Sequence, residues 1–436
     1  MPILNIKQFN IKRLRKKLPI HIFLKSKFSF ELLFILLIIF GIPLNLYKNR
    51  FYDNSWTVGE WLISYAGGFV RRGLPGELIH FISNKYSLSP ILLVWLFSFV
   101  ALFSLALLVL HFCKDLFDKS FLLSQLIILA PLSEDYFVRK DAFLVLSYGL
   151  CLLIMKALYQ KNISKLIAIL SVNFISIIAI FSHESYGIWG LPSLLIIFYI
   201  FEKYNKKNFV QSFLSATLFL IPSIFSFGLC WLYKGNTNHS IMIHQSWQSL
   251  SAIIPSISAL YAKEPTGAIA AIGWGTSQVF TSSLLTQFNL FIFWHPGMWF
   301  LTTYIAIKLF IGKKKDLNQK LKRTIVCSQL IAFFPMFLFV DIGRWIFIWI
   351  TSSALLFSFL YQTFGQRKLL YFLSILRGQK LLTKIIPEFS SIRNYNYFLL
   401  FFGIPHCCWS LGRYLVSNPI GFGIKNIIFY TKFLFN

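Results

Sequence analysis

Apolar stretches long enough to cross a lipid bilayer recur along this chain of 436 residues. Hydrophobic residues make up 56% of it and charged residues only 13%, which is too apolar a balance for one water-soluble core. About 20 apolar residues span the hydrocarbon layer, where the backbone must satisfy its own hydrogen bonds, so each stretch is predicted to be a helix. The predicted fold class is therefore an all-α, polytopic transmembrane bundle.

The hydropathy pattern predicts about eleven spans, of which the third and the last are the shortest. Residues 1–27 precede them as a basic tail, and residues 28–436 form a single bundle without an internal repeat. Two outer connections are long, residues 48–89 and 234–295, and long loops in compact proteins usually carry function. The predicted spans are residues 28–47, 90–113, 121–133, 142–159, 166–182, 186–201, 213–233, 296–311, 325–340, 345–361 and 397–411.

Basic residues set the predicted orientation, because cationic loops stay on the cytoplasmic side during insertion. Most of the 42 Lys and Arg residues lie on one side of the membrane when the N-terminus is cytoplasmic. Both long loops then face outward, and the Phe-, Ile-, Lys- and Asn-rich composition indicates a bacterial source, so the expected location is the bacterial inner membrane. The net charge of +27 is mostly this topology signal. Its dispersal over short loops argues against a nucleic-acid partner.

The first long loop carries two adjacent arginines, Arg71 and Arg72, within the sequence YAGGFVRRGLPGE. The surrounding glycines allow the backbone to turn tightly and to approach a ligand. Guanidinium groups bind phosphate oxygens through a planar fork and stay charged at any relevant pH. We interpret both arginines as pyrophosphate-binding candidates. The alternative is that they anchor the loop to lipid headgroups.

The fourth span opens with Arg139, Lys140 and Asp141, shortly after Glu134 and Asp135. In the structural interpretation, Asp141 caps the helix and the two cations pair with the preceding carboxylates. In the functional interpretation, Arg139 and Lys140 provide a second contact for an anionic ligand. The sequence leaves both open.

Two further span ends carry ionisable pairs. His183 and Glu184 end the fifth span within SHES, and partial burial is expected to raise the pKa of the Glu184 carboxyl into a range useful for proton abstraction. Asp341 and Arg344 open the tenth span within DIGRW. They form an intrahelical ion pair in one interpretation. In the other, Arg344 faces the anion while Asp341 orients it or acts as a base.

No motif in the chain indicates a bound cofactor. There is no Walker loop and no dinucleotide-binding glycine motif, so an activated substrate must supply the energy. His239 and His244 in the second long loop lack the spacing that aligns two metal ligands on a helix, and the six cysteines lack zinc-site spacing. We expect no metal, and we expect the second loop to form a lid of short helices.

The span pattern, the motif YAGGFVRRGLPGE, the charged helix end SHES and the large late loop resemble bacterial polysaccharide polymerases of the O-antigen type. These belong to a wider group of polyprenyl-phosphate-dependent membrane glycosyltransferases. The resemblance implies polymerisation of undecaprenyl-pyrophosphate-linked repeat units on the periplasmic face in surface polysaccharide synthesis. It also implies a polyprenyl-linked glycan substrate, contact with membrane lipid, and chain-length-regulating or flippase partner proteins.

Relatives of this type carry a catalytic Asp or Glu in the first outer loop, and Asp53 and Glu60 are the matching residues here. The base therefore stays open among Asp53, Glu60, Glu184 and Asp341. The expected reaction is an inverting displacement, in which a carboxylate takes the acceptor proton and arginines stabilise the departing pyrophosphate. The alternatives are a single-sugar transferase and, in another class, a lipid-linked oligosaccharide flippase, whose charges should line the bundle midplane.

Overall fold

The computed structural model describes residues 55–132, 138–204, 208–250, 264–274, 294–312, 319–333 and 342–375, with residue 281 and isolated residues between 399 and 432. The elements that it describes are helices, in agreement with the predicted all-α class. The predicted tail 1–27 and the predicted span 28–47 lie outside the described residues, as does nearly all of the span 397–411.

Six helices within the described residues are long and apolar enough to cross a membrane. Each coincides with a predicted span at its start to within a few residues, because hydropathy over such a window is a local property of the sequence. The last one runs past its predicted end and leaves helical dihedrals at Gly365, where φ is 68°. The six are α5 (Pro90–Cys113), α7 (Asp141–Tyr159), α8 (Lys165–Ser182), α9 (Ser185–Tyr204), α10 (Phe209–Leu232) and α16 (Ile342–Ile375).

Two further helices occupy predicted spans but are not among those six. α14 (Trp294–Ile311) coincides with the predicted span 296–311, and its described apolar part is Phe300–Ile311. α15 (Gln319–Phe333) begins before the predicted span 325–340, whose remainder lies outside the described residues. The described part of the chain therefore supports a multi-span bundle and does not test the full count of eleven.

The predicted span 121–133 is wrong. Only α6 (Lys119–Leu122) is helical there, and residues 123–132 form consecutive turns buried among the other helices. Ser124 organises these turns, because its carbonyl accepts from the amides of Ile127 and Leu129. Irregular backbone at membrane depth is tolerated where protein surrounds it and satisfies its polar groups. Hydropathy alone could not distinguish this buried passage from a helix.

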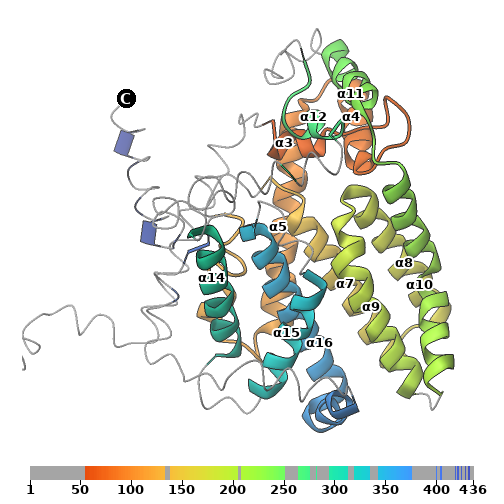
Figure 1. The fold of residues 1–436 in the computed structure, drawn as a ribbon, viewed down its shortest axis with the longest axis vertical. Coiled ribbons are helices and arrows are strands. Elements are labelled where there is room, and N and C mark those ends of the chain that lie inside the picture. Colours follow the sequence, from red (N-terminus) through yellow and green to blue (C-terminus); the bar gives the residue numbers. More distant parts are fainter. Residues whose placement is uncertain are drawn as a thin grey trace, which may run out of the picture.

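The long helices lie side by side, with α16 toward the middle and α10 at one edge (Figure 1). α16 is the most deeply buried span, at 83%, and packs against α5, α7 and α15. α10 is the least buried, at 33%, and lies beside α8 and α9 at the edge of the bundle. The site residues described below come from the ends of α7, α8 and α16, near the centre.

Four short helices cover one end of the bundle (Figure 1), and we call them the cap. They are α3 (Thr57–Trp61), α4 (Gly73–Tyr86), α11 (Thr237–Leu250) and α12 (Gly267–Ala271). The buried Trp247 donates its indole N–H to the carbonyl of Leu62 at 2.7 Å, which joins the second loop to the first. The amide of Ala268 donates to the carbonyl of Ser55 at 3.0 Å. The expected short helices are thus present in both loops.

An asparagine inside the membrane region joins α8 to α10. The Asn173 amide donates to the Phe219 carbonyl at 2.7 Å and accepts from the Ser223 amide at 3.2 Å and the Ser223 hydroxyl at 2.7 Å. Pro222 interrupts the helical hydrogen bonds of α10 at this point. The Asn173 side chain therefore satisfies backbone groups that the proline disturbs, and it fixes the two helices relative to each other.

Candidate functional site

Charged side chains from five parts of the chain meet where the cap covers the bundle. They come from α3, from the loop before α4, from the start of α7, from the α8–α9 connection and from the start of α16. We call these nine residues the charge cluster: Glu60, Arg71, Arg72, Arg139, Lys140, Asp141, His183, Glu184 and Arg344. Asp53 and Asp341, the remaining predicted site residues, lie outside the described residues.

Two arginines share one carboxylate in the charge cluster. Arg72 binds Glu184 bidentately, with Nε to Oε2 at 2.7 Å and Nη2 to Oε1 at 2.6 Å. Arg71 reaches Oε1 of the same Glu184 at 3.2 Å. The arginine side chains are 22% and 25% exposed, whereas the Glu184 side chain is 13% exposed. This trio therefore carries one surplus positive charge, and part of it is accessible.

The backbone that carries these arginines is held in an unusual conformation. Arg72 has φ 67°, in the left-handed region, immediately before α4. A Cβ atom on Gly73 would lie 2.3 Å from the ring of Tyr65, and one on Gly76 would lie 2.0 Å from the carbonyl oxygen of Ile63. Glycine is required at both positions because neighbouring groups occupy the space of a side chain. The glycine-rich loop predicted from sequence serves this packing.

Lys140 is hydrogen-bonded to the loop that carries the two arginines. Its fully buried ammonium donates to the carbonyl of Ser182 at 2.9 Å and to that of Arg72 at 3.3 Å, and it lies over the ring of Trp61. Burial lowers the pKa of Lys140 to about 7, with Glu60 opposing the shift and Arg72 adding to it. Lys140 therefore holds the carbonyl of Arg72 and the end of α8 together, and its role as a ligand contact stays a prediction.

Arg344 of α16 is held across the bundle by Asp141 of α7. The two form a buried bidentate pair, with Nε to Oδ2 at 2.8 Å and Nη2 to Oδ1 at 2.7 Å. The interpretation of Asp141 as a helix cap is wrong, since α7 starts at Asp141 itself and no side chain caps it. Arg344 also approaches Oε1 of Glu60 at 3.7 Å.

His183 contacts the buried carboxylate of Glu60. Its Nδ1 accepts from the amide of Ser185 at 3.2 Å, so Nδ1 carries no proton and Nε2 is the donor. Nε2 faces Oε1 of Glu60 at 3.1 Å. Desolvation, together with Arg72, lowers the pKa of His183, which agrees with a neutral imidazole. The second carboxylate oxygen of Glu60, Oε2, is buried and has no hydrogen-bond partner among the described residues.

The carboxylates of Glu60 and Glu184 both remain ionised although they are buried. Desolvation opposes ionisation of Glu60, but Arg344 and His183 outweigh it and hold the pKa of that carboxyl well below its ordinary value. Desolvation likewise acts against ionisation of Glu184, and Arg72 and Arg71 outweigh it, so its pKa is also well below the ordinary value. The expectation that burial raises the pKa of Glu184 is therefore wrong, because the arginines neighbour it directly.

Arg139 completes the charge cluster. Its side chain is nearly buried, and its charge contributes to lowering the pKa of Glu60. The predicted partners Glu134 and Asp135 lie outside the described residues. No group of three or more His, Cys, Asp or Glu side chains that could hold a metal ion occurs in the described part of the chain. The charges of this site point to an anionic ligand.

Residues 30–234 match the family model described as "Uncharacterised membrane protein Rv1490". The matched range is 205 of the 436 residues, a similarity over somewhat less than half of the chain. The protein is a multi-pass membrane protein, and the matched range includes every member of the charge cluster except Arg344. No curated protein and no solved structure matches the chain. The family description assigns no activity, so the chemistry rests on the geometry above.

Two features of the site were missed by sequence reasoning. Asp141 appeared only as a cap, although it is the carboxylate that holds Arg344 from another helix. Val138 was not singled out, although its carbonyl accepts from the indole of Trp61 and from the hydroxyl of Ser98. The only sequence signal for either was its position beside charged residues at a span end. Which partner each side chain meets depends on helix packing.

Proposed function

We propose that the protein is a membrane glycosyltransferase that takes a glycan from a polyprenyl pyrophosphate, and that it polymerises repeat units of a surface polysaccharide. The observation that carries the proposal is the arginine pair, in which Arg71 and Arg72 share Glu184 and stay partly exposed. A pyrophosphate carries negative charge that complements the surplus positive charge of the two arginines. It also offers the paired oxygens that a guanidinium group binds.

Among the described carboxylates, we assign Glu60 as the base. Both oxygens of Glu184 are engaged by arginines and both of Asp141 by Arg344, whereas Oε2 of Glu60 is buried without a partner among the described residues. A hydroxyl of the acceptor sugar would donate to it. A general base needs an oxygen within hydrogen-bond reach of the proton that it takes.

The proposed reaction is a single displacement at the anomeric carbon of the donor glycan. The acceptor oxygen forms a bond to the anomeric carbon of the donor while its proton passes to Glu60. The bond between that carbon and the pyrophosphate oxygen breaks, and its electron pair leaves with the pyrophosphate. Arg71 and Arg72 stabilise the charge that develops on this leaving group. The protonated Glu60 is then reset by loss of the proton to water.

The position of the charges favours an enzyme over a flippase. In the described spans, ionisable side chains lie near the helix ends, as Asp141 and Lys156 do in α7 and Arg344 does in α16. A transporter site is expected near the bilayer midplane, between interrupted helices. The charge cluster instead lies beneath the cap at one end of the bundle.

The test is the banding of surface glycan in the native host after deletion of the gene. We expect the ladder to collapse to a single repeat unit and wild-type protein to restore it. Glu60→Gln and Arg72→Ala should fail to restore it, since a base and a leaving-group contact each contribute about a hundredfold or more to rate. Lys85→Ala is the matched control, because this cap lysine is exposed and outside the charge cluster.

Expression of each variant is checked in the membrane fraction. A ladder that persists unchanged after deletion would overturn the polymerase proposal. A ladder restored by Glu60→Gln would remove Glu60 as the base while leaving the arginine pair as the site.

A further inference from the structure

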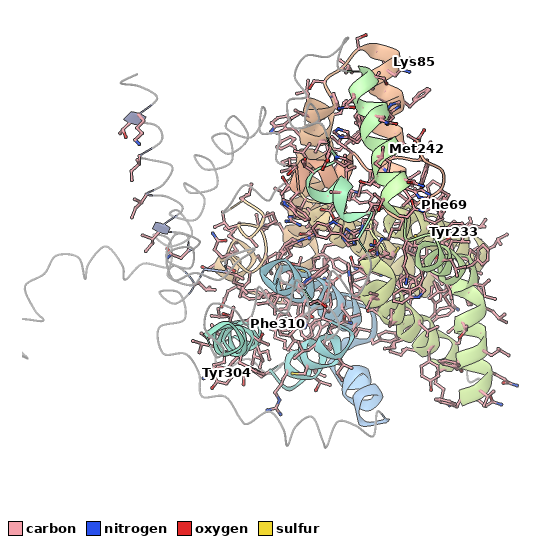
Figure 2. The ribbon with its side chains drawn as sticks, turned by 45° about the horizontal axis from the view of Figure 1, so that its top comes forward. Phe69, Lys85, Tyr233, Met242, Tyr304 and Phe310 are labelled. Carbon is pink, nitrogen blue, oxygen red and sulfur yellow. The ribbon has the colours of Figure 1, made fainter. Side chains whose placement is uncertain are left out.

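Four aromatic side chains gather beside the arginine pair, and we call them the aromatic cluster: Tyr65, Phe69, Phe181 and Tyr233. Phe69 is at its centre, with ring centroids 5.4 Å from Tyr65, 5.5 Å from Phe181 and 5.4 Å from Tyr233. Phe181 is at the cap end of α8, and Tyr233 directly follows α10. Figure 2 shows Phe69 and Tyr233 close together where the cap meets the bundle.

The aromatic cluster is joined directly to the arginine loop. The amide of Arg71 donates to the carbonyl of Tyr233 at 3.0 Å, and Phe69 lies two residues before Arg71 in the chain. The ring of Tyr65 also fills the space beside Gly73, next to Arg72. A ligand group held by the two arginines would therefore lie next to these rings.

Beside the aromatic cluster, the last residues of α10 and the residue after it are exposed. Tyr233 is 52% exposed, and its neighbours Trp231 and Leu232 are 57% and 75% exposed. Lys234 lies over the ring of Trp231 at 4.8 Å, an arrangement typical of the membrane interface. Further along, α8 and α10 expose large apolar side chains such as Phe174 and Phe225. Exposed apolar side chains thus lie on α8 and α10, the two helices that end beside the arginine pair.

We propose that the aromatic cluster receives the first isoprene units of the substrate, where the lipid chain leaves the arginine pair and enters the bilayer along α8 and α10. The inference rests on the proposed function and adds the binding surface of the lipid. The occupant is a polyprenyl pyrophosphate, because its charge complements the arginine pair and its unsaturated chain begins at the anionic group. Flat aromatic rings suit such a chain by dispersion contact.

A second apolar surface provides the competing path. α5 exposes Leu92, Leu96 and Phe103, and this face continues from α4, where Lys85 lies over Phe81 and Tyr86. The cation there is a single exposed ammonium without the guanidinium fork of the arginine pair. A lipid pyrophosphate should therefore prefer the α8–α10 side.

The experiment is photolabelling of the full-length protein in lipid nanodiscs, with a polyprenyl pyrophosphate that carries a diazirine in its first isoprene units. Labelled residues are mapped by mass spectrometry, with inorganic pyrophosphate and phosphatidylglycerol as separate competitors. We expect label at the cap ends of α8 and α10, displaced by inorganic pyrophosphate and not by an equal excess of phosphatidylglycerol. Phe69→Ala should lower the labelling affinity about fivefold, and Phe103→Ala on α5 should not change it.

The outcomes separate the two proposals. Label that inorganic pyrophosphate displaces but that maps to α4 and α5 overturns the aromatic-cluster path and leaves the pyrophosphate site standing. Displacement by phosphatidylglycerol with equal potency also overturns the inference, since the surface would then hold bulk lipid. Absence of any saturable label overturns the proposed function together with the inference. The map on wild-type protein decides the result even if Phe69→Ala fails to fold.

Discussion

The two ends of the bundle use charge differently. At the end away from the cap, Lys165 of α8 binds Glu202 of α9 at 2.8 Å, and its ammonium also lies over the ring of Phe219. This is one cation for one carboxylate. At the cap end, Arg71 and Arg72 share Glu184, and Lys140 donates to backbone carbonyls. A balanced pair is sufficient to join two helices, whereas the surplus of cations at the cap end is the basis of the proposed anion site.

The largest effect should come from the buried pair within the charge cluster. Arg344→Ala leaves Asp141 and Glu60 buried without their guanidinium partner, and such a loss costs about 3–5 kcal/mol. We expect a marked fall in Tm in detergent. The double variant Arg344→Met with Asp141→Leu should recover part of the Tm, because it removes the Asp141 charge together with Arg344 and leaves only Glu60 without the guanidinium, while the glycan ladder stays collapsed. An unchanged Tm for Arg344→Ala would show that this pair does not stabilise the bundle.

Lys140 should give an intermediate, pH-dependent effect. Its pKa is about 7 in the folded protein and returns to its ordinary, higher value on unfolding. The unfolded state therefore binds the extra proton above pH 7, so stability rises with pH there, by at most about 1.4 kcal/mol per pH unit. The Tm of wild type minus that of Lys140→Met should increase from pH 7 to pH 9.

Exposed Lys85 supplies the control for this measurement, since the difference between wild type and Lys85→Met should stay flat over the same range. A flat difference for Lys140→Met as well would mean that the Lys140 ammonium is solvated, which contradicts its burial.

The smallest effect should come from the opposite end. The Lys165 side chain is 47% exposed, so solvent screens its pair with Glu202. Because the Glu202 side chain is only 1% exposed, Lys165→Ala should cost more than the loss of an exposed pair but less than the about 3–5 kcal/mol of Arg344→Ala, and it should leave the glycan ladder intact. The measurements are Tm and the ladder in the complemented deletion strain. Loss of the ladder with an unchanged Tm would show that the end away from the cap also has a functional role, which contradicts our comparison of the two ends.

Much of the fold was predictable, because membrane insertion depends on the hydropathy of a short window of residues, which is a local property of the sequence. The bounds of α5 match its predicted span, and α7, α8 and α9 each begin one residue before theirs. The error at 121–133 has a clear reason: those residues are apolar enough for a span, but the surrounding helices bury them and satisfy their backbone through turns. Window hydropathy contains no information about what surrounds a segment.

The sequence predicted which residues belong to the candidate site. It did not predict which of them contact one another. The arginines, His183, Glu184, Glu60 and Arg344 could be named from their positions at span ends and in the first long loop. Their partners could not, since Arg72 and Glu184 are 112 residues apart and Arg344 and Asp141 are 203 apart. The pKa direction of Glu184 was wrong for the same reason, because it depends on arginines that only packing brings near.

The sequence by itself determined that the chain is helical, where six of its spans lie and which loops carry charge, because lipid solubility and backbone satisfaction depend on short windows of residues. The tertiary structure alone decided that Glu184 holds two arginines, that Asp141 holds Arg344, and that Phe69 joins the arginine loop to the ends of α8 and α10. These contacts depend on side-chain direction and on helices that are distant in sequence, which no local pattern encodes.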